Sequence, residues 1–210
     1  MNVRQIAAGP MDNFCYLAWE GAGPECAVID PCWEGAKIEK ELLALGLRPA
    51  LLALTHGHPD HLNAAAWFLE RYEGLRAALH PADGNMAEGL DRSRLLPVAD
   101  GEDLAAGALR LKVLHTPGHT PGSCSFLGPG AVFTGDTLFV GAIGRVDLPG
   151  ADPEQMRRSL LKLAALPGDT AVWPGHAYNG SSTTIEAQKL HNIYVKLAAK
   201  GGDEFISAAL

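Results

Sequence analysis

The sequence lacks several features that would assign it to a common protein class. Its cysteines, Cys15, Cys26, Cys32 and Cys124, form no CxxC pair and no regular spacing, so neither a thiolate zinc site nor a disulfide framework is indicated. We interpret them as reduced packing residues, with a single reactive thiol among them as the alternative. No run of basic residues is present and the formal net charge is −7, which argues against a nucleic-acid groove.

Long apolar runs are also missing. No segment approaches the ~20 apolar residues of a membrane span, and residues 1–6 do not begin a signal peptide. We therefore expect a cytoplasmic protein that has no membrane partner. The chain has 210 residues, of which 47% are hydrophobic, enough for one substantial core. Because its charge is acidic, an anionic substrate would need a local basic contact.

Residues 55–61, Thr-His-Gly-His-Pro-Asp-His, concentrate three histidines and a carboxylate in one short stretch. Core packing does not require such a cluster, because buried imidazoles need polar partners or a metal ion that takes their lone pairs. The stretch joins an apolar run at 50–54, which predicts a buried strand, to a helical pattern at 62–72. A solvated polar loop is the alternative, and the density of ligand types disfavours it.

The spacing within this stretch predicts two neighbouring metal positions. His56 and His58 are two residues apart in near-extended chain and point the same way, whereas Asp60 and His61 lie at the helix start and point to a second place. Three further candidates follow strands or lie in Gly/Pro turns, namely His119, Asp136 and His176. We assign His56, His58 and His119 to the first metal and Asp60, His61 and His176 to the second, with Asp136 bridging both.

The chemistry of these ligands favours two divalent ions. Three neutral imidazoles and a bridging oxygen suit Zn²⁺, whereas the more oxygen-rich second site also accepts Fe or Mn²⁺. The absence of cysteine from the set favours a catalytic over a structural site. His80, His115 and His191 have no clustered partners, so we interpret them as surface or hydrogen-bonded structural histidines.

The order of the expected elements predicts an α/β fold, a four-layer αββα sandwich that forms a single domain over residues 1–210. Strands are expected at 1–8, 13–19, 25–30, 50–54 and 75–80, with helices at 33–46 and 62–72 and a short helix within 81–89. Further strands at 95–98, 109–114, 123–127, 131–134 and 171–173 flank a helix at 153–166 that Asp152 caps, and a closing helix covers about 183–200.

These motifs resemble those of the metallo-β-lactamase superfamily over about residues 1–180. The His-x-His-x-Asp-His signature matches residues 56–61, and the later His, Asp and His match His119, Asp136 and His176. Within the superfamily, residues 135–145 are similar to glyoxalase II, the hydroxyacylglutathione hydrolases. The resemblance implies that Arg145 binds a glutathione carboxylate and that Tyr178 hydrogen-bonds the tripeptide.

The resemblance implies hydrolysis of a thioester such as S-lactoylglutathione, a small-molecule substrate. Metal-bound hydroxide would be the nucleophile, with Asp60 and Asp136 orienting it, and the thiolate leaves without a strong general acid. Longer family members add a helical C-terminal domain, whereas one closing helix is expected here, so the chain is more similar to the short, single-domain glyoxalase II-like proteins.

The same residues are compatible with other functions. A mononuclear iron persulfide dioxygenase would bind its metal through His56, His119 and Asp136. A lactonase or a β-lactamase would keep the hydrolytic centre and change the substrate, the β-lactamase being disfavoured because no export signal is seen. A metal-binding module without turnover is the alternative outside catalysis.

Overall fold

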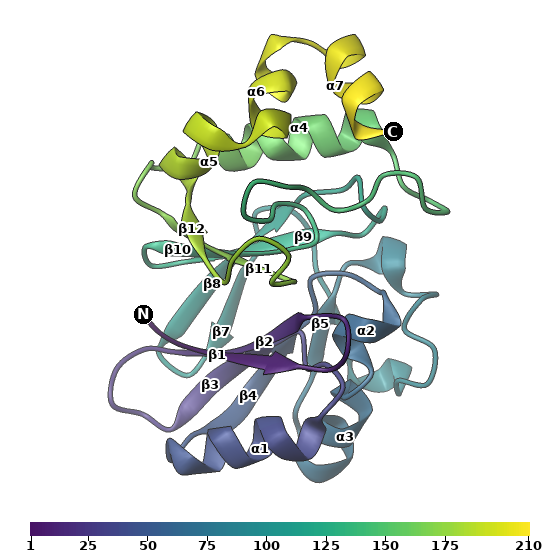
Figure 1. Ribbon diagram of the computed structural model, residues 1–210. Coiled ribbons are helices and arrows are strands. Elements are labelled where there is room, and N and C mark those ends of the chain that lie inside the picture. Colours follow the sequence, from purple (N-terminus) through teal and green to yellow (C-terminus); the bar gives the residue numbers. More distant parts are fainter.

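Two six-stranded mixed β-sheets lie face to face at the centre of the molecule (Figure 1). The structure is a computed structural model that describes residues 1–210. The first sheet has the order β1-β2-β3-β4-β5-β6 and the second the order β12-β11-β10-β9-β8-β7. Parallel pairing joins β3 to β4, β4 to β5, β5 to β6 and β10 to β11, and the other neighbours are antiparallel.

The strands have the following bounds. The first sheet contains β1 (Asn2–Ala8), β2 (Asn13–Trp19), β3 (Glu25–Ile29), β4 (Arg48–Ala53), β5 (Ala77–Leu79) and β6 (Leu95–Pro97). The second contains β7 (Asp103–Ala106), β8 (Leu109–His115), β9 (Cys124–Gly128), β10 (Ala131–Gly135), β11 (Ala171–Pro174) and β12 (Thr183–Thr184). The short strands β7 and β12 were not expected from the sequence.

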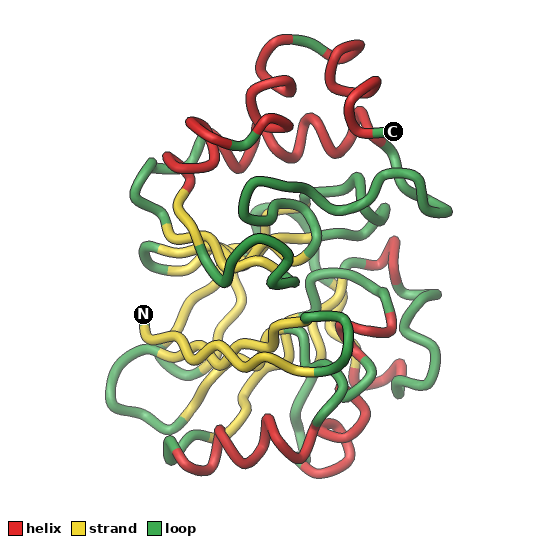
Figure 2. The backbone as a smooth tube through the Cα atoms, viewed as in Figure 1, coloured by secondary structure: helices red, strands yellow, loops and turns green.

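Helices cover the outer face of each sheet, which confirms the predicted αββα layers (Figure 2). The first sheet carries α1 (Gly35–Ala44), α2 (Pro59–Leu62) and α3 (Ala65–Arg71), and the second carries α4 (Pro153–Ala164), α5 (Ile185–His191), α6 (Ile193–Lys200) and α7 (Gly202–Ala209). Asp152 caps α4 as expected, since its side chain accepts hydrogen bonds from the backbone of Glu154 and Gln155.

Strand β2 is buried on both of its faces. Cys15 and Leu17 point into the core beneath the first helical layer, whereas Phe14, Tyr16 and Ala18 point into the core between the sheets. Successive side chains of a strand alternate between its faces, so a continuous apolar run is buried on both sides.

Three helix predictions were wrong in their extent. The helix expected at 62–72 is divided into α2 and α3. Only the 3₁₀ turn η1 (Pro81–Asp83) forms within 81–89. The closing helix at 183–200 is interrupted at Asn192, whose extended backbone ends α5 while its side chain accepts from Tyr194 N and so caps α6. Beyond it α7 adds a further helix, anchored by the fully buried Phe205.

Two predictions about cysteines and membranes can be compared with the structure directly. All four cysteines are buried and unpaired, in agreement with their role in packing. None of the helices combines the length and the apolar character that crossing a membrane would require.

Candidate metal centre

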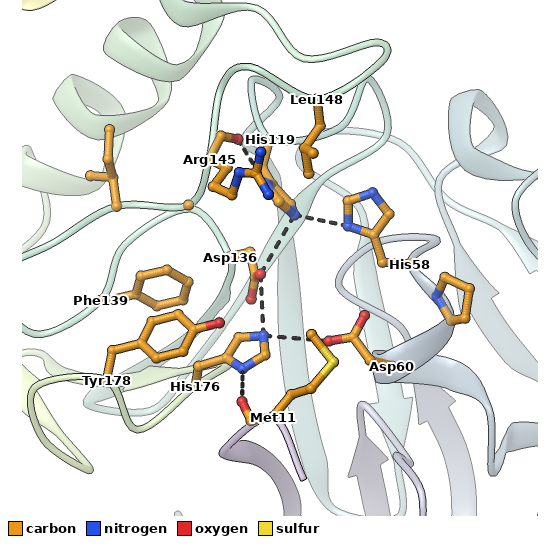
Figure 3. A pocket seen from close by; sticks show the side chains of 13 residues that line it. Met11, His58, Asp60, His119, Asp136, Phe139, Arg145, Leu148, His176 and Tyr178 are labelled. Atoms are coloured by element: carbon orange, nitrogen blue, oxygen red, sulfur yellow. Dashed lines mark hydrogen bonds and ion pairs between the residues drawn. The ribbon is translucent and has the colours of Figure 1, made fainter. Parts of the chain in front are cut away.

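Seven polar side chains converge where strands of both sheets end, and Figure 3 shows most of them around one cavity. The stretch 55–61 follows β4, His119 lies between β8 and β9, Asp136 follows β10 and His176 follows β11. Three groups have ligand atoms within 4.8 Å of one another: His56, His58 and His119; His56, His61 and Asp136; and Asp60, His61 and His176. The structure therefore brings together all seven residues that the sequence singled out.

The first group, His56, His58 and His119, is called here the three-histidine group. His119 Nδ1 lies 2.8 Å from the carbonyl oxygen of Arg145, which only accepts, so Nδ1 carries the proton and Nε2 holds a lone pair. That Nε2 lies 2.9 Å from His58 Nδ1. Two imidazoles that come from different sheets therefore turn nitrogen atoms towards a common point.

His56 completes this group through a similar chain of hydrogen bonds. The hydroxyl of Thr55 donates to Asp30 Oδ2 at 2.7 Å, so its oxygen accepts from His56 Nδ1 at 3.0 Å. The proton of His56 is thus on Nδ1, and its buried Nε2 has no hydrogen-bond partner in the protein. A buried lone pair without a partner is costly unless a cation uses it.

The third group, Asp60, His61 and His176, is called here the aspartate group. His61 Nδ1 lies 3.1 Å from Asp30 Oδ2, and His176 Nδ1 donates to Met11 O at 2.7 Å. Both Nδ1 atoms face acceptors, so both Nε2 atoms hold lone pairs, and these lie only 3.0 Å apart. The arrangement requires a cation between or beside the rings, either a proton or a metal ion.

Asp136 lies between the two groups, as Figure 3 shows. Its Oδ2 is 3.5 Å from His119 Nε2 and 3.4 Å from His176 Nε2, and its Oδ1 is 3.3 Å from His61 Nε2. Oδ1 is buried and forms no hydrogen bond. One carboxylate therefore faces both groups, and the whole donor set, five imidazoles and two carboxylates without thiolate, fits two divalent metal ions.

The electrostatics of the cluster indicate the same requirement for positive charge. Burial, with His61 close by, places the pKa of His56 well below its ordinary value, so that ring is neutral. Burial opposes the charge of Asp136, yet the neighbouring His61 and His176 hold its pKa well below the ordinary value. Burial also opposes charging of His61, but Asp136 raises the pKa of that ring. Without a metal, the site compensates its buried carboxylate by protonating histidine.

Asp30 joins the two groups and was missed as a functional residue by the sequence reasoning. It follows β3, is buried, and adopts a φ of 48°, in the left-handed region. Its carboxylate accepts from Thr55 N and Thr55 Oγ1, each at 2.7 Å, and lies 3.1 Å from His61 Nδ1. The available signal was an aspartate directly after an apolar strand, the same signal that identified Asp136.

Asn13 holds the aspartate group from the other side and had no comparable signal. Its Nδ2 donates to Asp60 Oδ2 at 2.9 Å, while its Oδ1 accepts from Trp33 Nε1 at 2.9 Å. Because an indole N–H only donates, Trp33 fixes which end of the amide faces Asp60. Asn13 itself is fully buried, so this orientation is held by packing as well.

Glycines allow the backbone to approach Asp136 closely. A Cβ added at Gly175 would lie 2.4 Å from Asp136 Oδ1, and one added at Gly144 would lie 1.9 Å from its carbonyl oxygen. Neither distance is sterically allowed, so a larger residue at Gly175 would displace the carboxylate and one at Gly144 would displace the backbone that carries it.

A cavity of about 430 Å³ opens over the cluster. Its floor includes His58, Asp60, His119, Asp136 and His176, and its walls include Met11, Pro59, Phe139, Ile143, Gly144, Arg145, Leu148 and Tyr178. The polar groups of the cluster thus lie at the base of a largely apolar pocket, as in many small-molecule sites.

Both residues expected to contact substrate lie in this wall. The Tyr178 ring stacks on His176, with centroids 4.8 Å apart and planes 7° from parallel. The Arg145 side chain is 67% exposed, and its guanidinium forms two hydrogen bonds of 2.9 Å with Asp147. The cation at the pocket is therefore already paired, although an exposed ion pair of this kind contributes little and exchanges easily.

Comparisons with known proteins agree with this architecture. The sequence model of the metallo-beta-lactamase superfamily matches residues 8–176. The hydroxyacylglutathione hydrolase of Gloeobacter violaceus is 36% identical over 169 residues, which make up 80% of this chain and 64% of that protein. The match thus spans slightly less than two thirds of that relative.

Two solved structures resemble all or most of the chain. ETHE1 from Myxococcus xanthus has a TM-score of 0.87 at 32% identity, covering 100% of this chain and 90% of that one. TTHA1623, solved in a di-iron-bound form, has a TM-score of 0.80 at 36% identity, covering 91% of this chain and 99% of that one. The chain belongs to the metallo-β-lactamase superfamily, which confirms the predicted family and fold.

Proposed function

We propose that the protein is a binuclear metal-dependent hydrolase that cleaves a thioester, with S-lactoylglutathione as the first substrate to test. The observation that carries this proposal is the pair of imidazole groups joined by one carboxylate. The three-histidine group leaves His56 Nε2 without a partner, and the aspartate group turns two Nε2 atoms towards each other at 3.0 Å. Asp136 faces both, which supports one cation in each group with Asp136 as the shared ligand.

Two divalent ions in these positions would lower the pKa of a water molecule and polarise the substrate carbonyl. Zn²⁺ suits the three-histidine group, and Zn²⁺, Fe or Mn²⁺ suits the aspartate group. Asp60 and Asp136 then orient the attacking water from the floor of the cavity. One oxygen of Asp60 is held by Asn13, so the direction of the other is defined.

The pocket walls support a thioester of moderate size. Phe139, Ile143 and Leu148 provide apolar surface, and a cavity of about 430 Å³ is large enough for a small acyl group and part of its thiol. Hydrolysis releases a carboxylic acid and a thiol, and the thiol leaves as a stable thiolate. No buried general acid is needed, in agreement with a floor whose polar groups are already assigned as ligands.

Arg145 and Tyr178 are the substrate-binding residues in this proposal. Arg145 would exchange Asp147 for a substrate carboxylate, and the hydroxyl of Tyr178, a half-exposed residue at the pocket, would donate a hydrogen bond to the thiol portion. Similarity to a hydroxyacylglutathione hydrolase supports glutathione as that thiol.

The experiment is an activity panel on the purified protein with its metal content measured. The panel includes S-lactoylglutathione, other thioesters, a lactone, a β-lactam and glutathione persulfide with oxygen consumption recorded. We expect thioester hydrolysis at two metals per chain. Oxygen consumption with the persulfide at one iron per chain would instead establish the dioxygenase alternative, and hydrolysis of only the lactone or the β-lactam would change the substrate class.

A further inference from the structure

Asp83 is a buried carboxylate whose partners are all on the loops of the three-histidine group. It ends η1, is fully buried, and accepts from Gly57 N at 2.9 Å, Thr120 Oγ1 at 2.6 Å and Gly122 N at 2.6 Å. No basic side chain is among these partners. Three short hydrogen bonds therefore compensate for the cost of burying the carboxylate.

The partners of Asp83 lie next to the histidines of the three-histidine group. Gly57 lies between His56 and His58, at the end of a strand in the first sheet. Thr120 and Gly122 directly follow His119, in the loop between two strands of the second sheet. A single side chain thus connects the two segments that supply the three-histidine group, whereas it forms no hydrogen bond with Asp60, with His61 or with the loop of His176.

The surrounding residues are shaped to this carboxylate. A Cβ added at Gly122 would lie 2.5 Å from Asp83 Cγ, and one added at Gly57 would lie 3.1 Å from Asp83 Cβ and 2.6 Å from Met86 Cβ. Thr120 donates its only hydroxyl proton to Asp83, so its oxygen accepts from Ser123 Oγ at 2.7 Å. Asp83 therefore accounts for Gly122 and for the order of the two hydroxyls, whereas Gly57 is required by Met86 as well as by Asp83.

We propose that Asp83 is a positioning residue for the first metal, which sets the distance and orientation of His56 and His58 relative to His119. The inference rests on the metal-binding role proposed above but not on the identity of the substrate. Since the hydrogen bonds of Asp83 end at residues that flank the histidines of one group, it controls the affinity of one metal site selectively. Outer partners of this kind change metal affinity by roughly 10–100-fold when removed.

The test uses Asp83→Asn in the zinc-loaded protein, with a chelator titration that measures zinc retained per chain. Asparagine keeps one acceptor oxygen, and its NH₂ group would face the N–H of Gly122 or that of Gly57, so a hydrogen bond is replaced by a repulsive donor–donor contact. We expect one zinc ion per chain to leave at a chelator concentration lower by roughly 10–100-fold, and the other to leave as in the wild type. The d–d bands of the Co²⁺-substituted variant should shift as well.

Asp91→Asn is the matched control. Asp91 caps the neighbouring 3₁₀ turn η2 (Arg92–Arg94) by accepting from Ser93 N at 2.9 Å, but it is exposed and makes no contact with the metal-ligand loops. This variant should retain the wild-type chelator profile and Co²⁺ spectrum. A comparable change in Asp91→Asn would overturn the proposal, because the effect would then not depend on the hydrogen bonds that Asp83 accepts.

Thr120 provides a second, gentler test if Asp83→Asn folds poorly. Thr120→Ser keeps the hydroxyl that donates to Asp83 and should keep both zinc ions at wild-type affinity, whereas Thr120→Val should weaken one of them. A wild-type chelator profile for both Asp83→Asn and Thr120→Val contradicts the proposal, as does parallel loss of both ions together with a lower unfolding temperature.

Measurements on the wild-type protein separate this proposal from the proposed function. A protein that binds two metals but has no thioesterase activity would refute only the proposed substrate. A protein that binds no metal would refute both the proposed function and the positioning role of Asp83.

Discussion

The three-histidine group and the aspartate group differ in how the protein holds them. The three-histidine group is held by two outer contacts. The buried carboxylate of Asp83 joins the loops that carry its histidines, and the Arg145 carbonyl orients His119. The aspartate group is fixed from the β1–β2 hairpin, where Met11 orients His176 and Asn13 orients Asp60. Asp30 reaches His61 directly and His56 through Thr55, but the other outer partners belong to one group each, so substitutions of these partners should alter one group without the other.

Several hydrogen bonds join the β1–β2 hairpin of the first sheet to the segment around His176, which follows a strand of the second sheet. Phe14 N donates to Gly175 O at 2.8 Å, Ala177 N donates to Asp12 O at 2.9 Å, and the Tyr16 hydroxyl donates to Pro174 O at 2.5 Å. The loop that carries His176 is thus bound to the hairpin on both sides of the ligand. The position of His176 depends on backbone of the first sheet, although the residue follows a strand of the second.

Removal of Asp136 should have the largest effect, because this carboxylate faces both groups. We expect Asp136→Ala to lose at least one metal per chain and more than about 100-fold in turnover, beyond the loss typical of outer partners. Metal content by elemental analysis and thioester hydrolysis measure the two effects. Full activity in this variant would show that Asp136 is not the shared ligand.

Asn13→Ala should affect only the aspartate group. Asp60 loses the donor that orients it, so we expect one metal to bind roughly 10–100-fold more weakly while the three-histidine site keeps its affinity. A chelator titration measures both in one experiment. Trp33→Phe is the finer comparison, since it keeps an aromatic ring and removes only the N–H that fixes the Asn13 amide. Equal weakening of both metals in Asn13→Ala would refute the independence of the two groups.

The same contrast explains which part of the side-chain cluster could be predicted from the sequence. The polar side chains of 55–61 are local, and the turn between strand and helix places them without knowledge of the fold. His119, Asp136 and His176 could be identified because each lies in a Gly/Pro turn or directly follows an apolar strand, and strand ends meet at one sheet edge.

The outer partners could not be predicted in this way. Asn13 and Asp60 are 47 positions apart, and Asp83 lies 26 positions from Gly57 and 39 from Gly122. Only the packed sheets bring such pairs together, and none of these residue types carries a distinctive pattern of its own. The break at Asn192 was missed for a related reason, since its capping side chain competes with a helix pattern that is otherwise continuous.

A smaller comparison is possible between Arg145, in the pocket wall, and its ion-pair partner Asp147. Arg145→Ala should raise KM for an anionic thioester by roughly fivefold or less, with kcat unchanged, because a fully exposed ion pair contributes little to binding. Asp147→Asn should lower KM, because it releases the guanidinium for the substrate. Steady-state kinetics at low salt measure both, and an unchanged KM in both variants would remove Arg145 from the substrate site.

Modification of the cysteines should have the smallest effect, because neither group uses a thiol. Burial raises the pKa of Cys26, Cys32 and Cys124 to about 12, so the folded protein keeps them as neutral thiols at pH 8. Iodoacetamide at that pH should leave the native protein unlabelled and its metal content unchanged. Rapid labelling of the native protein would contradict this and restore the reactive-thiol alternative.

The same pKa values predict how stability depends on pH. Above about pH 9 the unfolded chain releases its thiol protons, whereas the folded chain keeps them until about pH 12, so the unfolded state binds fewer protons and stability falls as the pH rises. Replacing one thiol removes its share of this dependence. The free energy of unfolding in urea should therefore differ less between wild type and Cys26→Ala at pH 10 than at pH 8. A difference that stays constant or grows with pH would show that Cys26 ionises as readily in the folded chain as in the unfolded one.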